Sequence, residues 1–139
     1  MKNIVKYLSI ILIALSLIGC EIGTLPVIHI GDSTKFSEEE INEAVDCVKR
    51  NFDFESSILT DIYYDESKSD TIIKNYLNYG EDNKNKVEPE NIIALLSDFD
   101  VNNSGNNPTL TAGETYVDFS FVLIRDDENG EWIIDDMGY

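Results

Sequence analysis

The sequence ETYVDFSFVLIRDDENGEWIIDDM, residues 114–137 of a 139-residue chain, decides the fold class. Its first half alternates apolar and polar residues, which is typical of a strand with one buried face. The expected core face carries Val117, Phe119, Phe121 and Leu123. Asn129-Gly130 is a hairpin turn signal, and residues 131–137 are apolar enough to return as the partner strand. The pattern predicts an antiparallel hairpin at the end of the chain.

Two further strands are indicated upstream of this hairpin. Residues 91–101 contain the run Ile92-Ile93-Ala94-Leu95-Leu96, which is apolar on both faces and therefore predicts a central strand. Residues 58–64 are rich in Ile, Leu, Thr and Tyr, the composition expected of a strand.

Two helices are expected between residues 37 and 79. Ser37 and Glu40 form an S-x-x-E capping box, and the glutamates at 38–40 suit the positive end of a helix dipole. This helix should run to Asn51 and bury one apolar stripe, formed by Ile41, Ala44, Val45, Val48 and Phe52. A second helix over 68–79 is indicated by Ser67 with Asp70 as a capping signal and by Gly80 as a stop.

The order of these elements is helix, strand, helix and then antiparallel strands. It predicts an α+β fold in which helices pack on one face of a curved, mostly antiparallel sheet. Residues 34–139 are expected to form this single domain, because a chain of this length leaves little room for two.

The first twenty residues have the features of an export signal. Lys2 and Lys6 are followed by an uncharged, Leu- and Ile-rich run at 7–19, which is too short for a membrane span of about 20 residues. The ending Leu17-Ile18-Gly19-Cys20 resembles the lipobox of bacterial lipoproteins. The resemblance implies that residues 1–19 are a cleaved signal peptide and that Cys20 carries a diacylglyceryl group. Such an anchor would hold the protein at the extracytoplasmic face of the cell membrane.

The charge balance excludes some partners. There are 27 acidic and 10 basic residues, a net charge of −17, and nucleic-acid binding is disfavoured because it requires a basic face. Cleavage after residue 19 would remove two lysines and no acidic residue, so the net charge of the remaining chain would be −19. Anionic lipid head groups would repel this body, so residues 20–33 are expected to act as a tether. Residues 27–30, Val-Ile-His-Ile, are alternatively apolar enough for a short edge strand.

The element order and the ending Gly130-Glu131-Trp132-Ile133-Ile134-Asp135-Asp136-Met137-Gly138-Tyr139 resemble the cystatin-like cone of the nuclear-transport-factor-two-like (SnoaL-like) superfamily. More narrowly, residues 36–42, residues 96–100 and the terminal Trp132 to Tyr139 are similar to small lipoproteins of Gram-positive anaerobes that carry an uncharacterised domain. The resemblance implies a fold and a location. In the wider superfamily the concave sheet face encloses a pocket, and its enzymes use His/Asp or Tyr/Asp pairs. No residue is carried over, because no histidine matches the catalytic one.

Few residues offer catalytic chemistry. His29 is the only histidine and lies in the expected tether, where it would be a poor general base or zinc ligand. Cys47 would be the only unmodified cysteine, and we expect a small packed residue beside the apolar stripe, with a reactive or intermolecular thiol as the alternative. An acid–base enzyme needs a desolvated carboxyl group, and the candidates are Asp118 and Asp98; both are expected to be solvated strand residues on the outer face. No cofactor is indicated.

One loop partly matches a calcium site. Oxygen-bearing side chains stand at alternate positions before Gly105, and the candidate ligands are Asp98, Asp100, Asn102 and Ser104. The match is incomplete, because Thr111 occupies the position of the bidentate glutamate. A polar connection between two strands explains the same residues.

The sequence therefore predicts a lipid-anchored, non-enzymatic domain that binds a small ligand or a protein partner. A carboxylate-based enzyme of the same fold and a calcium-dependent module are the alternatives. A homodimer is left open. Six aromatic residues are candidates either for lining a ligand pocket or for the core and sheet surface, namely Tyr63, Tyr64, Tyr76, Tyr79, Tyr116 and Trp132.

Overall fold

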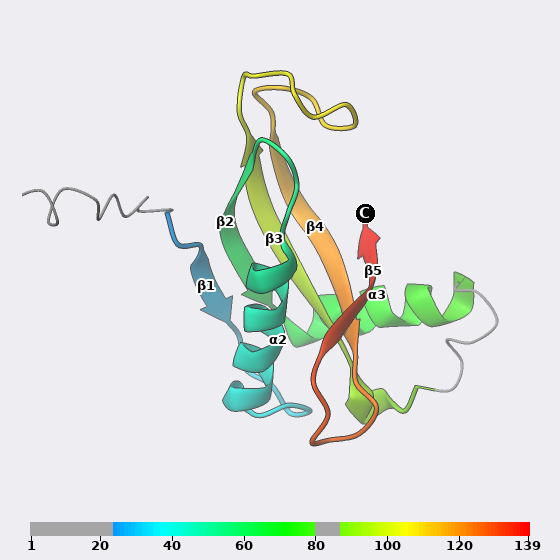
Figure 1. Ribbon diagram of the computed structural model, residues 1–139. Helices are drawn as coiled ribbons and strands as arrows, with labels where there is room; N and C mark the ends of the chain where they lie inside the picture. The colour runs from blue at the N-terminus through cyan, green and yellow to red at the C-terminus, as the bar shows by residue number, and fades with distance from the viewer. Residues whose placement is uncertain (1–23, 80–86) are drawn as a thin grey trace, which may run out of the picture.

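The computed structural model describes residues 24–79 and 87–139 (Figure 1). The expected signal segment, Cys20 and the Gly80 stop lie outside the described residues. The elements are β1 (Val27–Ile30), α2 (Glu38–Asn51), β2 (Ser57–Tyr64), α3 (Glu66–Tyr79), a 3₁₀ turn (Pro89–Asn91), β3 (Ile92–Val101), β4 (Thr115–Ile124) and β5 (Ile133–Gly138). No helix in the described part of the chain is long and apolar enough to cross a membrane.

The strands form one mixed sheet in the order β1-β2-β3-β4-β5, which is not closed into a barrel. β1 pairs in parallel with β2, and the other three pairs are antiparallel. The α+β class and the mostly antiparallel sheet are thus confirmed. Residues 27–30 were expected to be either part of a tether or a short edge strand, and they form the edge strand β1. The domain therefore begins at residue 27.

Helix α2 begins as its sequence predicts. Ser37 is the N-cap: its Oγ accepts from the Glu40 N–H at 3.2 Å, and the Glu40 carboxylate accepts from the Ser37 N–H at 2.8 Å. The reciprocal bonds satisfy two backbone donors at the helix start. The expected apolar stripe is confirmed, since Ile41, Ala44, Val45 and Val48 are buried and Phe52 packs against the same core.

Helix α3 begins two residues earlier than predicted, and the expected capping role of Ser67 is wrong. The Asp65 carboxylate accepts from the Lys68 N–H at 2.8 Å, while Ser67 lies inside the helix. An aspartate is a good N-cap and its side chain reaches the third helical N–H, so it fixes the start ahead of the serine.

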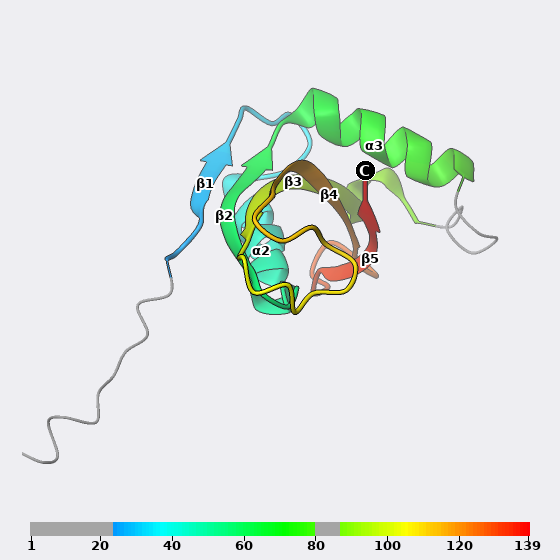
Figure 2. The same ribbon diagram turned by 90° about the horizontal axis from the view of Figure 1, so that it is seen from above.

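The two helices cover opposite faces of the sheet, and the prediction that both lie on one face is wrong. Figure 2 shows α2 inside the curl of the sheet and α3 outside it. The sequence of β3 explains this arrangement, because a strand that is apolar on both faces needs cover on both. Ile93, Leu95 and Phe99 pack with α2, whereas Ile92 and Ala94 pack with Tyr76 of α3.

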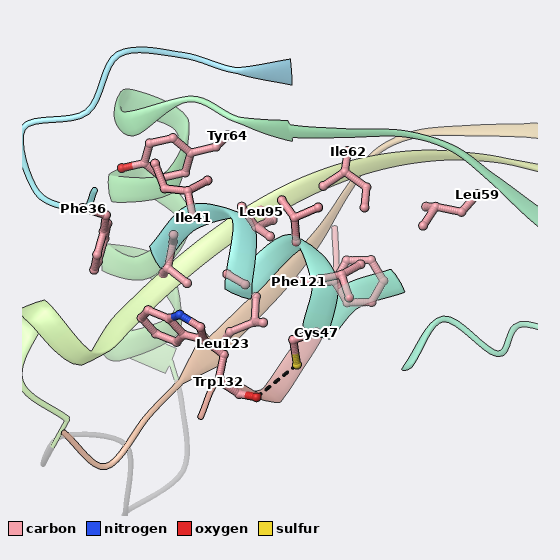
Figure 3. Packing of buried hydrophobic residues seen from close by; sticks show 14 of the residues in the cluster. Phe36, Ile41, Cys47, Leu59, Ile62, Tyr64, Leu95, Phe121, Leu123 and Trp132 are labelled. Carbon is pink, nitrogen blue, oxygen red and sulfur yellow. Dashed lines mark hydrogen bonds between the residues drawn. The ribbon is translucent and has the colours of Figure 1, made fainter. Parts of the chain in front are cut away.

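The concave face holds the main core (Figure 3). Cys47 is a small packed residue of this core, as expected, at 2 % exposure, and its Sγ–H donates to the Trp132 carbonyl oxygen at 3.1 Å. Burial raises the pKa of the Cys47 thiol. Part of this core is a cluster of contacting aromatic rings, namely Phe52, Phe54, Phe99, Tyr116, Phe119 and Phe121.

Strand β4 contains a bulge that changes its alternation. Ser97 pairs with Phe119 and Phe99 with Tyr116, so Val117 and Asp118 together oppose Asp98. The expected core position of Val117 is therefore wrong: Val117 is 54 % exposed, and Tyr116 takes its place on the concave face. Asp118 has a φ of 55°, a conformation that side-chain-bearing residues rarely adopt outside turns and bulges.

Candidate binding recess

A recess of about 760 Å³ lies on the convex face of the sheet, beside the start of α3. Its lining residues come from the ends of β1 and β2, from the start of α3, from β3 and from the β4 bulge. They are residues 28–31, residues 63–65, Lys68, Asp98, Val117 and Asp118. The parallel pairing of β1 with β2 and the bulge in β4 bring residues of β1, β2, α3, β3 and β4 together around this recess. Its volume falls within the range of small-molecule sites.

His29 and Tyr63 form one wall of this recess. Their rings stack with centroids 4.7 Å apart and an interplanar angle of 9°. His29 Nε2 lies 3.0 Å from Asp61 Oδ1 on the neighbouring strand, and this contact is the largest cause of the lowered pKa of Asp61. His29, which was expected to lie in a tether, is thus part of strand β1. Its ring is held by the stacking contact with Tyr63 and the hydrogen bond with Asp61 of β2.

Asp98 lines the recess, and both of its carboxylate oxygens have protein partners. Its Oδ2 accepts from the Tyr63 hydroxyl at 2.7 Å, and its Oδ1 accepts from the Asp118 N–H at 2.9 Å. The hydrogen bond to Asp98 is the largest cause that raises the pKa of Tyr63, to about 12, so this phenol stays neutral at physiological pH. The expectation that Asp98 is fully solvated needs correction, because both carboxylate oxygens have protein partners.

Both neighbours of β3 are irregular at Asp98. β2 shifts register between Leu59 and Asp61, and the Thr60 hydroxyl donates to the Asp98 carbonyl oxygen at 3.1 Å. The β4 bulge lies on the other side. Bulges often redirect side chains near functional sites. Here the two irregularities flank the same carboxylate, which is the strongest geometric feature of the convex face.

Lys68 is the cation in this recess. Its Nζ lies 3.3 Å from Asp118 Oδ1, and both side chains are more than half exposed. Asp118 is solvent-exposed, as the sequence predicts, but its role as the partner of Lys68 depends on the bulge and has no signal in the local sequence.

A second recess, of about 420 Å³, lies between α3 and β5. It is lined mainly by tyrosines and aliphatic side chains, among them Tyr76, Tyr79 and Tyr139. The Tyr76 hydroxyl donates to Asp135 at 2.5 Å beside it. Burial and this bond raise the pKa of Tyr76.

The six aromatic residues that the sequence offered as pocket or core residues lie in three places: the first recess, the second recess and the main core. Tyr63 and Tyr64 border the first recess, and Tyr76 and Tyr79 the second. Tyr116 and Trp132 pack in or against the main core, where Trp132 is 4 % exposed.

The calcium candidates have separate protein partners. Asp98 is bonded as described, Asp100 accepts from the Thr115 hydroxyl at 2.6 Å, and Ser104 contacts Ser56 at 3.0 Å. Asn102 Oδ1 accepts from the Ser104 N–H at 2.9 Å, which closes a polar turn. Within residues 24–79 and 87–139, no group of three or more His, Cys, Asp or Glu side chains is placed to hold a metal ion.

The recess has one sequence signal that the tether interpretation overlooked. In Ile28-His29-Ile30 the two isoleucines alternate with the histidine, so a strand buries them and turns His29 to the other face. Ile28 and Ile30 do pack against the main core. Pairing with Tyr63, 34 positions later, depends on a parallel register that local sequence does not encode.

Comparison with known families gives one match. The model of a family described as "Domain of unknown function (DUF4829)" matches residues 37–138, which include α2, α3 and strands β2 to β5. Comparisons with curated proteins and with solved structures give no match.

Proposed function

We propose that this chain, which belongs to the DUF4829 family, is a lipid-anchored extracytoplasmic protein. In this proposal its domain binds a ligand and does not convert it chemically. The recess beside the start of α3 is the proposed ligand site. The observation that carries this proposal is the convergence of two strand irregularities on Asp98, next to the stacked His29–Tyr63 wall.

A binding role accounts for the recess better than a catalytic role. A general acid requires a carboxyl group whose pKa is raised. Hydrogen bonds instead lower the pKa of Glu40, Asp61 and Glu66, which suits carboxylates that act as acceptors rather than as proton donors. The concave face, where a cone-shaped enzyme would hold its substrate, is filled by aromatic rings.

The anchoring part of the proposal rests on residues 1–20. A basic start, a short apolar run and Gly19-Cys20 are the features of a lipoprotein signal. β1 begins at Val27, so only residues 21–26 would separate the lipidated cysteine from the sheet. A fully extended chain of six residues reaches about 20 Å. The anchor would therefore keep the domain close to the membrane.

Replacing Cys20 by serine should release the protein from the membrane. The hydroxyl of serine cannot form the thioether, and without two acyl chains the acidic domain has no stable membrane affinity. Metabolic labelling with a radioactive fatty acid and membrane fractionation measure this. The matched control is Cys47→Ser, which removes the other thiol and should keep both label and location. Persistent label on the Cys20→Ser protein would disprove the anchor.

The recess itself can be tested by filling it. Val117→Trp adds an indole at the rim without removing any hydrogen bond described above, whereas Ile133→Trp adds the same group at an exposed position outside the recess. A ligand at 100 times its Kd stabilises a protein by about 2.7 kcal/mol. We expect at least one class in a panel of cationic, neutral and anionic small molecules to raise the melting temperature of the wild type and of Ile133→Trp, but not of Val117→Trp. Equal shifts in all three proteins, or no shift in any, would contradict the proposed site.

A further inference from the structure

We infer that the group recognised in this recess is a primary ammonium, which takes the place that Lys68 Nζ occupies against Asp118. The inference rests on the proposed function and deepens it, because it gives the ligand a chemical class. The chain supplies its own example of the interaction: an ammonium already lies 3.3 Å from Asp118 Oδ1 at the edge of the recess.

The internal lysine is easily displaced. The side chains of Lys68 and Asp118 are 57 % and 62 % exposed. An ion pair this exposed contributes only about 0.2–1 kcal/mol, because water screens the charges and two long side chains lose freedom. Lys68 also lies in the first turn of α3, where the helix dipole does not favour a cation. An arriving ammonium therefore competes with a weak partner.

The charges around the recess select a cation. Asp65, Asp98 and Asp118 border it, and Asp61 adjoins it through His29, whereas Lys68 is the one lysine or arginine among its lining residues. An anionic ligand would be repelled by these carboxylates. A neutral ligand would leave the Asp118 carboxylate with its present lysine partner and would gain little from it.

The size and walls of the recess select an organic cation rather than a metal ion. A volume of about 760 Å³ greatly exceeds the space that one ion requires, and the described carboxylates do not converge in a ligand set. The stacked His29 and Tyr63 rings and the exposed Val117 give an apolar surface for the carbon chain of an amine. Both a free amine and the lysine side chain of a protein partner have this chemistry.

Calorimetric titration of the purified full-length chain in non-ionic detergent at low salt tests the inference. The probes are 1,5-diaminopentane for a free amine, acetyl-Gly-Lys-Gly-amide for a protein lysine, and 1,5-pentanediol as the uncharged analogue. We expect binding of at least one amine probe and none of the diol. Tighter binding of the diamine identifies a free amine as the ligand, and tighter binding of the peptide identifies a lysine side chain.

Two pairs of substitutions make the test specific. Lys68→Met should tighten binding by up to about fivefold, the upper value of an exposed ion pair, because it removes the competitor. Asp118→Asn should weaken binding by a similar or larger factor. The matched controls are Lys49→Met and Asp46→Asn, which break the exposed Lys49–Asp46 pair on α2 with the same changes of charge. These controls should leave the affinity unchanged.

Three results would overturn the inference: no binding of either amine, equal binding of the diol, or the same effect of Lys68→Met and Lys49→Met. The recess-filling experiment separates such a failure from failure of the proposed function. If an uncharged or anionic compound stabilises the wild type but not Val117→Trp, the site is a ligand site and only its ammonium class is wrong.

Discussion

Replacing Phe99 by alanine should lower the free energy of unfolding by about 3–5 kcal/mol, the cost of truncating a buried phenylalanine. Phe99 has 0 % exposure and lies on β3, the central strand. Its ring contacts four others, those of Phe52, Phe54, Tyr116 and Phe119. The Tyr116 ring is stacked on it at 5.0 Å. Truncation would leave these rings around a cavity that they cannot close without moving the β4 bulge.

Urea denaturation followed by circular dichroism measures this loss. The matched control is Ile58→Ala on β2, which removes an apolar side chain that is 52 % exposed and should cost under about 1 kcal/mol. Single domains are stable by only about 5–15 kcal/mol, so Phe99→Ala should remove a large share of the total. Equal small losses for the two variants would mean that the concave face is loosely packed and available to a ligand.

This result bears on the choice of functional site. The resemblance of the element order to a cystatin-like cone implied a pocket on the concave face. The rings of β3, β4 and the α2–β2 connection instead make that face the main core. The proposed ligand site lies outside the curl instead, in the recess by Asp98 on the convex face.

The local features of the fold were readable from the sequence. The Ser37–Glu40 box sets the start of α2 through bonds that span three residues, and the apolar stripe of that helix follows from its own period. The run at 92–96 predicted a central strand correctly, because a strand buried on both faces has no polar alternation. Each of these signals acts within about one turn or one strand.

The recess depends on relations that local patterns do not contain. The alternation of β4 breaks at Val117 because a bulge inserts one residue, and only the partner strand shows where the bulge lies. His29 meets Tyr63 across a parallel register, and Lys68 meets Asp118 across 50 positions. The positions of α2 and α3 on opposite faces of the sheet also depend on how the strands pair along the chain. The sequence predicted the residues of the core well and the residues of the recess poorly for this reason.

Arg125→Ala should lower the free energy of unfolding by about 2–4 kcal/mol, because it removes a buried cation and its hydrogen bonds from a Glu40 carboxylate that is 29 % exposed. The Arg125 side chain is 2 % exposed, and its Nη2 donates to Glu40 at 2.7 Å and to the Glu90 carbonyl oxygen at 2.9 Å. Its guanidinium lies 4.4 Å from the Trp132 ring centre. One side chain thus joins the start of α2, the 3₁₀ turn and the residue that leads into β5.

The double variant Arg125→Met with Glu40→Gln tests whether the stability lost in Arg125→Ala comes from the unpaired charge and lost packing or from the hydrogen bonds of the guanidinium. Methionine keeps much of the apolar stem, and glutamine can still complete the capping box with Ser37. Arg125 Nη1 has no hydrogen-bond partner among the described residues, so an apolar replacement also removes an unsatisfied buried donor. We expect the double variant to recover most of the stability lost in Arg125→Ala. If both proteins lose the same amount, the lost hydrogen bonds of the guanidinium explain the loss of stability, rather than lost packing or an unpaired Glu40 charge.

The dependence of stability on pH gives a second measurement of this pair. Hydrogen bonds from the Ser37 backbone, and then from Arg125, lower the pKa of Glu40 below its ordinary value of 4.5. A carboxyl group whose pKa is lowered in the folded state stabilises the fold above its unfolded pKa and loses that contribution as the pH falls through its folded pKa. The wild type should therefore exceed Glu40→Gln in unfolding free energy at pH 7, and the difference should decrease below about pH 4.5. The control Glu43→Gln, an exposed acid on the same helix, should show no such difference at either pH. A constant difference between the wild type and Glu40→Gln from pH 7 to pH 3 would show that the ionised carboxylate is not what stabilises this junction.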